Sequence, residues 1–291
     1  MITIASESIV SAEWLMKNLG SANLAILDAS WYMPAEQRNC RQEFELAHIP
    51  SASFFDIDAV SDSATNLPHM LPTAEQFTGA MRALGLNNSQ TIVVYDTAGL
   101  FSAPRAWWMF RVFGHQKVAV LDGGLAAWTQ LGGTLESGRE LPGKEVGDFT
   151  ASAPDSRLLR TLEQVWDALE TGSEQVLDAR SRPRFLGEQA EPRPGLRSGH
   201  MPGARNLPFQ QVLELDRGML LSPESIRECL QSVQIDPEKP VITSCGSGIT
   251  ACVLALALYR VGVNVAVYDG SWAEWGARSE TPVEPTTSYS N

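Results

Sequence analysis

Short runs of aliphatic and β-branched residues alternate with amphipathic segments along the chain. Ser11 is the expected cap of a helix that runs to about Leu19, and a capping box of Thr161 and Gln164 opens its counterpart. Strands that alternate with helices at this spacing form βαβ units, so we predict an α/β fold with mostly parallel sheets flanked by helices. The predicted strands form three pairs: 25–28 with 175–178, 91–95 with 240–244, and 118–121 with 263–268.

The strands recur in pairs because the chain contains a long internal repeat. Sequence boxes of the first half recur in the second at an offset of about 150 residues, which is far longer than a solenoid period and indicates a duplicated domain. The boxes are 47–52 with 199–204, 27–30 with 177–180, and 120–128 with 267–275. The stretch between the copies is rich in Gly, Pro, Ser and charge, as is typical of a linker. We therefore predict an N-terminal copy at 1–135, a linker at 136–157 and a C-terminal copy at 158–285.

The composition narrows the possible classes of function. The 291 residues carry 34 acidic and 22 basic side chains, a net charge of −12, so binding to nucleic acid or to an anionic membrane is not expected. The longest uncharged apolar run, 249–259, is too short to span a bilayer, and the first residues lack the features of a secretory signal. Four cysteines are too few for a disulfide scaffold of this size, and we expect a cytoplasmic protein.

The candidate chemistry lies in a glycine-rich loop at the end of a predicted strand in the second copy. There Cys245 is followed by Gly246, Ser247 and Gly248, and the next helix begins near Thr250. Two glycines allow the backbone to curl so that its N–H groups converge on one point, and the helix N-terminus adds positive potential. A cysteine in such a cradle has its thiolate stabilised and can act as a nucleophile.

The corresponding loop of the first copy has Asp96 where the second copy has Cys245, and no thiol of its own. We therefore predict that the first copy is not catalytic. The remaining cysteines lie outside such a loop and are expected to be structural: Cys40, Cys229 and Cys252.

The spacing of residues around the cysteines disfavours two other functions, a tyrosine phosphatase and a metal site. A tyrosine phosphatase carries a Cys-x5-Arg signature, and counting from Cys245 the arginine would fall on Ala251. The few histidines and cysteines are not clustered as ligand pairs, so no metal site is expected. No organic cofactor is expected either.

The repeated boxes, the cysteine loop and the duplicated order of elements resemble the tandem-domain rhodanese family over essentially the whole chain. Within this family, the Cys-Gly-Ser-Gly-Ile-Thr loop is similar to that of 3-mercaptopyruvate sulfurtransferases, whereas thiosulfate sulfurtransferases tend to carry cationic residues at the positions of Gly246 and Ser247. The resemblance implies two rhodanese-like domains, with Cys245 as the catalytic residue. It also implies donor-binding contacts from the loop, at Gly246, Gly248, Ile249 and Thr250.

The resemblance also assigns side chains outside the loop. Arg184 and Arg193 match family positions that hold the carboxylate and keto oxygens of the donor, a task that suits the planar fork of arginine. Asp58 and His69, both in the first copy, match a segment proposed to line up with Ser247 as a proton relay. The arginines expected to be solvated are Arg180, Arg182 and Arg197. The histidines expected to stabilise turns are His48 and His200.

The resemblance implies a sulfurtransferase in which Cys245 takes the sulfane sulfur of 3-mercaptopyruvate as a persulfide and releases pyruvate. Cyanide, a small thiol or a thioredoxin-like protein is then expected to remove the outer sulfur. Two alternatives stay open: a thiosulfate sulfurtransferase of the same fold, and a persulfide carrier that does not turn over a donor of its own.

Overall fold

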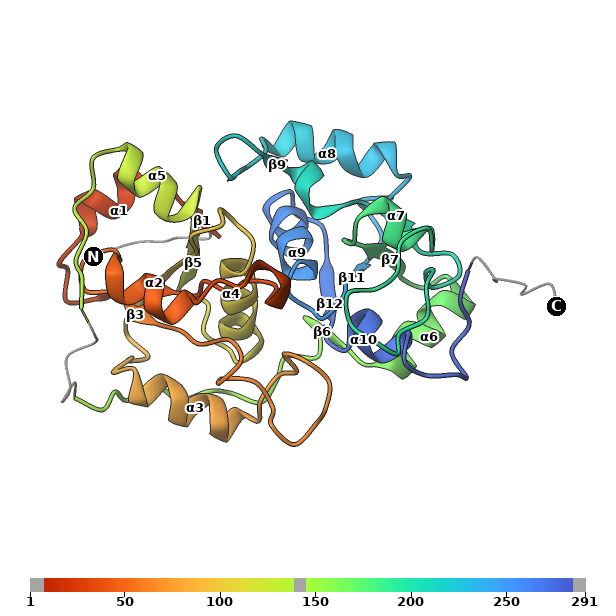
Figure 1. Cartoon of the computed structure of the whole chain (residues 1–291), viewed down its shortest axis with the longest axis horizontal. Coiled ribbons are helices and arrows are strands. Elements are labelled where there is room, and N and C mark those ends of the chain that lie inside the picture. Colours follow the sequence, from red (N-terminus) through yellow and green to blue (C-terminus); the bar gives the residue numbers. More distant parts are fainter. Residues whose placement is uncertain (1–7, 139–144, 285–291) are drawn as a thin grey trace. The chain divides into compact units, whose positions relative to one another are not determined.

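A computed structural model describes residues 8–138 and 145–284. The first seven residues, part of the predicted linker at 139–144, and the C-terminal end at 285–291 lie outside the described residues. The chain forms two compact units, one built mainly from the first copy and one mainly from the second (Figure 1). The duplication predicted from the repeated boxes is therefore visible as two separate cores.

The N-terminal unit contains a five-stranded sheet in which all neighbouring strands are parallel, in the order β1-β5-β4-β2-β3. Its strands are β1 (Ile9–Val10), β2 (Leu24–Asp28), β3 (Ser53–Phe54), β4 (Thr91–Tyr95) and β5 (Val118–Leu121). Its helices are α1 (Ala12–Asn18), the 3-10 turn η1 (Pro34–Glu36), α2 (Cys40–Leu46), α3 (Ala74–Ala83), α4 (Ala103–Val112) and α5 (Gly124–Gln130).

The sheet of the C-terminal unit has the same topology, in the order β6-β12-β11-β7-β8, and is also parallel throughout. Its strands are β6 (Leu159–Arg160), β7 (Gln175–Asp178), β8 (Arg205–Asn206), β11 (Val241–Ser244) and β12 (Val265–Tyr268). Its helices are α6 (Leu162–Thr171), α7 (Arg182–Phe185), the 3-10 turn η2 (Phe209–Val212), α8 (Pro223–Ser232), α9 (Ala251–Arg260) and α10 (Ser271–Trp275). The predicted parallel α/β fold is confirmed in both units.

The helix caps form as the sequence predicts. The Ser11 hydroxyl accepts a hydrogen bond from the Trp14 amide at 3.2 Å, and Thr161 with Gln164 forms the capping box of α6. These bonds satisfy amide groups that have no partner inside the first helical turn.

The central strands are buried on both faces. All five residues of β4 are buried, and because side chains alternate along a strand, Val93 and Tyr95 face opposite to Ile92 and Val94. Val93 and Tyr95 pack in one cluster with Trp128 of α5. In the second unit α9 packs on β11 and β12 (Figure 1). Strands covered in this way read as continuous apolar runs, which is why the sequence shows them clearly.

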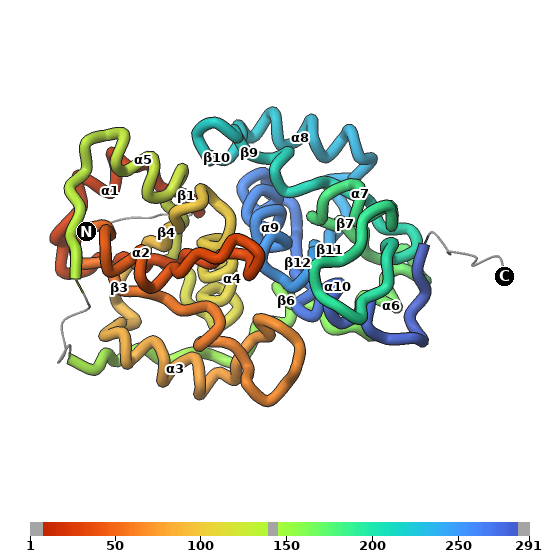
Figure 2. The backbone as a smooth tube through the Cα atoms, in the orientation of Figure 1, coloured from red at the N-terminus to blue at the C-terminus, as the bar shows by residue number. Residues whose placement is uncertain are grey.

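Each compact unit also includes a short segment from the other half of the chain. Residues Ala64–Met70 belong to the C-terminal unit, and Glu214–Leu220 belong to the N-terminal unit. The second segment lies in the hairpin of β9 (Leu213–Glu214) and β10 (Met219–Leu220), which Figure 2 shows as a tight turn of the tube. The two segments stand at equivalent places in the repeat, so the exchange is itself duplicated.

Part of the predicted linker is packed rather than extended. Residues up to Asp155 belong to the N-terminal unit, and Phe149 is buried against Phe77 and Phe110. The domain limits given above stay a prediction. Among the described residues, no helix has the length and apolar character needed to cross a membrane.

Candidate active site

The cysteine loop lies where parallel α/β sheets usually form their sites, beyond the carboxyl end of a central strand. Cys245 follows β11 directly, and the loop ends at Thr250, which precedes α9. The amide of Ala179, which follows β7, donates to the carbonyl of Ser244 at 2.8 Å and fixes the strand end below the loop. Both Cys245 and Ile249 are buried, so the loop is part of the core and not a surface excursion.

The sulfur of Cys245 receives a hydrogen bond from within the loop. The Gly248 amide lies 3.1 Å from the Cys245 Sγ and donates to it. Gly248 has φ +79°, a left-handed conformation that glycine adopts without strain. The curl that the sequence predicted is present, and it directs an N–H group at the sulfur.

The main chain of Cys245 is anchored by the residue at the start of α10. The Cys245 amide donates to the Ser271 hydroxyl at 3.1 Å, and the Cys245 carbonyl accepts from the Trp272 amide at 2.9 Å. Ser271 has φ +49°, a strained conformation for a residue with a side chain. Strained residues that persist are held by their surroundings, and this one lies directly beside the candidate nucleophile.

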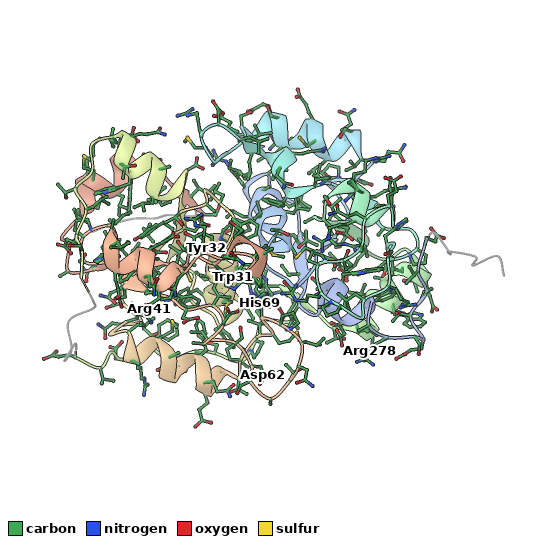
Figure 3. The ribbon with its side chains drawn as sticks, viewed as in Figure 1. Trp31, Tyr32, Arg41, Asp62, His69 and Arg278 are labelled. Atoms are coloured by element: carbon green, nitrogen blue, oxygen red, sulfur yellow. The ribbon has the colours of Figure 1, made fainter. Side chains whose placement is uncertain are left out.

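Ser247 is paired with a histidine from the exchanged segment Ala64–Met70. The Nδ1 of His69, a residue labelled in Figure 3, lies 3.1 Å from the Ser247 hydroxyl and 3.2 Å from the Ser247 carbonyl oxygen. Both side chains are buried, and His69 has φ +60°. The structure therefore brings together two of the three members of the predicted relay, although they stand far apart in the sequence.

Arg184 lies against the same loop. A Cβ atom added to Gly246 would come within 3.0 Å of the Arg184 Nη2, so the guanidinium occupies the space above this glycine. Arg184 in turn binds Glu191, with the Nη2–Oε2 distance at 2.5 Å and the Nε–Oε1 distance at 3.2 Å. One candidate donor-binding arginine is thus adjacent to the cysteine loop and held there by a buried carboxylate.

The expectation that Arg180 and Arg197 are solvated is wrong. The Arg180 side chain is fully buried, binds both oxygens of Asp178, and stacks over Trp272 at 4.1 Å from the ring centroid. Arg197 donates to the carbonyls of Trp275 and Gly276 from partly buried positions. The carbonyl partners of Arg197 lie about eighty residues away in the sequence, so local composition could not reveal them, whereas Asp178 lies only two residues from Arg180. Arg182 is exposed, as expected.

The paired histidines have the same role in both copies. His48 stacks on Phe44 and donates from Nδ1 to the Phe44 carbonyl at 2.7 Å, and His200 does the same with Phe185 at 2.8 Å. Each histidine therefore binds and stacks on the last part of a helix, and the expectation that both stabilise turns stays a prediction.

In the first copy, the loop that follows β4 surrounds the carboxylate of Asp96. Asp96 follows β4 as Cys245 follows β11, and its Oδ2 accepts from the amides of Phe101, Ser102 and Ala103 at 2.7–2.9 Å. Burial raises the pKa of Asp96, and these amides oppose that effect. In the first copy the amides that follow the strand thus surround an internal carboxylate and not a thiol.

Two predicted site residues have positions but no tested role. Asp58 is exposed in the N-terminal unit and accepts a hydrogen bond from the Trp31 Nε1 at 3.0 Å. Arg193 is partly buried on the segment between α7 and β8. Their assignments as relay member and donor ligand stay predictions.

The other cysteines have structural surroundings. Cys252 is buried in α9 and donates from its sulfur to the Gly248 carbonyl at 3.2 Å, which supports the loop from below. Burial raises the pKa of both Cys40 and Cys229, which disfavours their thiolates. These contacts agree with the structural roles expected for them.

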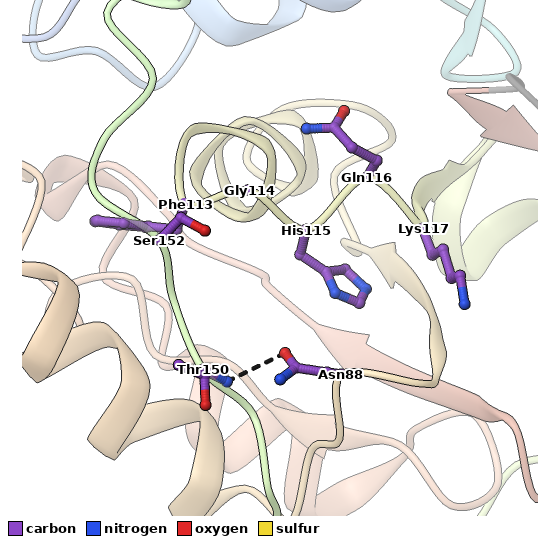
Figure 4. A pocket seen from close by; sticks show the side chains of 8 residues that line it. All are labelled: Asn88, Phe113, Gly114, His115, Gln116, Lys117, Thr150 and Ser152. Atoms are coloured by element: carbon purple, nitrogen blue, oxygen red, sulfur yellow. Dashed lines mark hydrogen bonds between the residues drawn. The ribbon is translucent and has the colours of Figure 1, made fainter.

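A cavity in the N-terminal unit is not used by the predicted chemistry. It has a volume of about 310 Å³ and none of the predicted site residues lines it (Figure 4). His115, one of its lining residues, is buried, and this burial lowers its pKa. The lining residues are Asn88, Phe113, Gly114, His115, Gln116, Lys117, Thr150 and Ser152.

Two further residues, not predicted from the sequence, contact the site. Glu191 lies within the arginine-rich segment, and an acid among several arginines was a signal that could have found it. Ser271 belongs to a repeated box, but nothing in the local sequence links it to Cys245. That link depends on the neighbouring ends of β11 and β12 in the sheet.

Comparisons with known proteins show which family and which relatives the chain is similar to. The model of the rhodanese-like domain matches the chain twice, at residues 11–131 and 161–278. The thiosulfate/3-mercaptopyruvate sulfurtransferase 1 of Arabidopsis thaliana, named as mitochondrial, is 46% identical over 98% of this chain and 80% of its own length. The 3-mercaptopyruvate sulfurtransferase of Escherichia coli K12 is 45% identical over 95% of this chain and 97% of its own length.

A solved structure shows the same architecture. The crystal structure of SseA from Escherichia coli, described with the rhodanese fold of 3-mercaptopyruvate sulfotransferases, superimposes with a TM-score of 0.83 at 42% identity. The match covers 91% of this chain and 99% of that one. This chain belongs to the rhodanese family and carries two tandem rhodanese-like domains.

Proposed function

We propose that this protein is a sulfurtransferase that moves the sulfane sulfur of 3-mercaptopyruvate to a thiol acceptor through a persulfide on Cys245. The observation that carries the proposal is the joint placement of a thiol and a guanidinium at one loop. The Cys245 sulfur accepts the Gly248 amide at 3.1 Å, while Arg184 lies over Gly246. The names of the similar sulfurtransferases from plant and bacterium support the same donor.

The first step forms one sulfur–sulfur bond and breaks one carbon–sulfur bond. The Cys245 thiolate attacks the sulfur of 3-mercaptopyruvate, and the electron pair of the broken bond stays on the carbon as the enolate of pyruvate. The loop amide at Gly248 stabilises negative charge on the sulfur before and after the transfer. Gly246 and Thr250 complete the loop that surrounds the bound sulfur, and buried Ile249 seats it in the core.

The enolate then needs a proton. We assign its delivery to Ser247 and His69, whose hydroxyl and Nδ1 lie 3.1 Å apart, with Asp58 as the third member of the relay. The carboxylate of the donor is assigned to Arg184 and Arg193, which can hold it with paired N–H donors. This places the sulfur of the donor at the thiol and the carboxylate away from it.

In the second step the persulfide gives up its outer sulfur. An acceptor thiolate attacks that sulfur, forms a new persulfide and returns Cys245 to its thiolate form. Cyanide serves as acceptor in an assay, and a small thiol or a thioredoxin-like protein is the proposed acceptor in the cell. A cytoplasmic location is proposed from the sequence alone, and one similar plant enzyme is named as mitochondrial.

Intact-mass measurement after incubation with 3-mercaptopyruvate, without an acceptor, tests the covalent step. The protein is expected to gain one sulfur atom while one equivalent of pyruvate is released. Cys245→Ser should gain none, and Cys252→Ser, a buried cysteine seven residues on, is the matched control that should still gain one. Equal labelling of the wild type and Cys245→Ser would contradict the assignment.

A thiosulfate donor is the second candidate, and one observation favours it. The plant relative is named for both donors. Steady-state kinetics with the two donors and cyanide decides between them. A persulfide carrier, the third possibility, would stop after one equivalent of pyruvate even when cyanide is present.

A further inference from the structure

Glu191 is a buried carboxylate that lies between two guanidinium groups of the C-terminal unit. Its side chain is 1% exposed. Its Oε1 accepts from Arg180 Nη1 at 2.8 Å and from Arg184 Nε at 3.2 Å, and its Oε2 accepts from Arg184 Nη2 at 2.5 Å. We propose that Glu191 determines the donor selectivity of this enzyme, by fixing which edge of Arg184 faces the donor and by cancelling its charge. The proposal rests on the function proposed above and extends it.

Glu191 restricts the orientation of the Arg184 guanidinium. A guanidinium has five N–H donors in a rigid plane, and Glu191 takes Nε–H and one Nη2–H of Arg184. Within the described part of the chain, this leaves the Nη1 and the second Nη2 hydrogens for a ligand. Two parallel N–H groups along one edge match the two oxygens of a planar carboxylate. The Arg184 side chain is 20% exposed, so it is not fully closed off from a small molecule.

Glu191 also changes the net charge around Arg184. Arg180 is paired with Asp178 at 2.7 Å, and Arg184 with Glu191, so the four side chains together carry no net charge. Such a cluster attracts a dianion such as thiosulfate only weakly, because attraction at a distance follows net charge. It still binds a monoanionic carboxylate through short directional bonds. Glu191 therefore favours a donor with a carboxylate over a donor with two charges near its sulfur.

Glu191 is not needed merely to neutralise Arg180. That arginine already has both oxygens of Asp178 and the carbonyl of Gly199 as partners. The first copy, which lacks the catalytic cysteine, has Ser30 at the position of Arg180. The bonds of Glu191 to Arg184 are thus additional to the support of the fold, and they act on a residue at the cysteine loop.

Kinetics with two donors tests the proposal, with cyanide as the acceptor. Glu191→Gln leaves Arg184 with an uncancelled charge and a weaker hold. We expect KM for 3-mercaptopyruvate to rise about tenfold and KM for thiosulfate to fall severalfold. Glu191→Asp keeps the negative charge, but its side chain is one methylene shorter and no longer holds Arg184 in the same orientation. KM for 3-mercaptopyruvate should therefore rise, while KM for thiosulfate stays within about twofold.

Glu174→Gln is the matched control, since it breaks the partly buried pair of Glu174 with Arg160, at 2.9 Å, in the same unit. Neither KM should change in that variant.

If Glu191→Gln raises both KM values by the same factor, or changes neither, the proposal is wrong. If Glu191→Gln does not fold, Glu191→Asp decides, and equal changes for both donors would overturn the proposal. A wild-type protein that does not turn over 3-mercaptopyruvate would refute the proposed function instead, and the thiosulfate values would still test the charge effect.

Discussion

The Nδ1 of His69 lies within hydrogen-bonding distance of both the hydroxyl and the carbonyl oxygen of Ser247, at 3.1 and 3.2 Å. A carbonyl oxygen can only accept, so the shared contact requires the tautomer with a proton on Nδ1. That proton then also points at the Ser247 Oγ, which leaves the hydrogen of Ser247 to be donated onward. In the proposed relay, this arrangement corresponds to proton movement from His69 to Ser247.

We predict that His69→Asn lowers kcat with 3-mercaptopyruvate by about 100-fold, because general acid catalysis contributes on this scale. Asparagine tolerates the left-handed conformation found at His69, where φ is +60°, so the backbone is not strained further. Its amide can donate to Ser247, but it cannot release a proton to the enolate.

Thiosulfate is the internal control for this variant. Sulfite leaves as a stable anion and needs no proton, so kcat with thiosulfate should stay within about threefold of the wild-type value. Losses of equal size with the two donors would show that His69 supports the loop rather than the proton transfer.

We predict that Gly246→Ala weakens donor binding without affecting the fold. The new Cβ would lie 3.0 Å from Arg184 Nη2, and Glu191 restrains the guanidinium from moving away. Because a small displacement of the Arg184 guanidinium weakens its hydrogen bonds to the donor carboxylate, KM for 3-mercaptopyruvate should rise on the order of five- to tenfold. Gly246 does not have a positive φ, so backbone strain does not contribute.

Gly79→Ala in α3 is the matched control, because an added Cβ there has no neighbour within 4 Å. It should leave KM unchanged and raise the stability by about 0.5–1 kcal/mol, as expected for a helix interior. An unchanged KM in Gly246→Ala would mean that Arg184 does not hold the donor from this position.

We predict that Asp28 makes the stability of the protein depend on pH. Burial raises its pKa from 3.8 to about 6, and the amide and hydroxyl of Ser30 oppose the effect only in part. The folded state therefore keeps a proton that the unfolded chain has lost. The stabilisation is complete below about pH 3.8 and is lost as the pH rises through about 6, a change of about 3 kcal/mol.

Urea unfolding at about pH 4 and about pH 7.5 measures this effect. The free energy of unfolding of the wild type should fall by about 2.5 kcal/mol more over this range than that of Asp28→Asn, which cannot ionise, because at pH 4 the unfolded Asp28 is already partly ionised. Identical pH dependence in the two proteins would contradict a buried, protonatable Asp28. The comparison between variants removes the contributions of other carboxylates.

The strands could be predicted because they depend on local pattern, whereas their order in each sheet comes from the structure. The predicted strands 91–95 and 175–178 match β4 and β7, and β4 shows most clearly how a central parallel strand buried on both faces becomes a mainly apolar run. The caps at Ser11 and Thr161 were found for the same reason, as the side chain and the amide it binds are three residues apart. Predictions of this kind need no knowledge of the rest of the chain.

The arginines show where local pattern fails. Arg180 and Arg197 lie in a segment that looks solvated, yet each is held by groups brought together by folding. The carbonyl partners of Arg197 are about eighty positions away, beyond any local signal. A charged side chain is buried only where its partners are supplied, and the sequence alone does not say where that is.

The sequence by itself determined that the chain is a duplicated α/β protein of the rhodanese family, that one copy holds a cysteine in a glycine-rich loop, and that the other holds Asp96 instead. Only the tertiary structure decided that His69 reaches Ser247 through an exchanged segment, and that Glu191 holds Arg184 over Gly246. The reason is physical. Periodicity, capping and turn chemistry act between neighbours in the chain, whereas hydrogen bonds and ion pairs act over a few ångströms in space, and only folding brings distant residues that close.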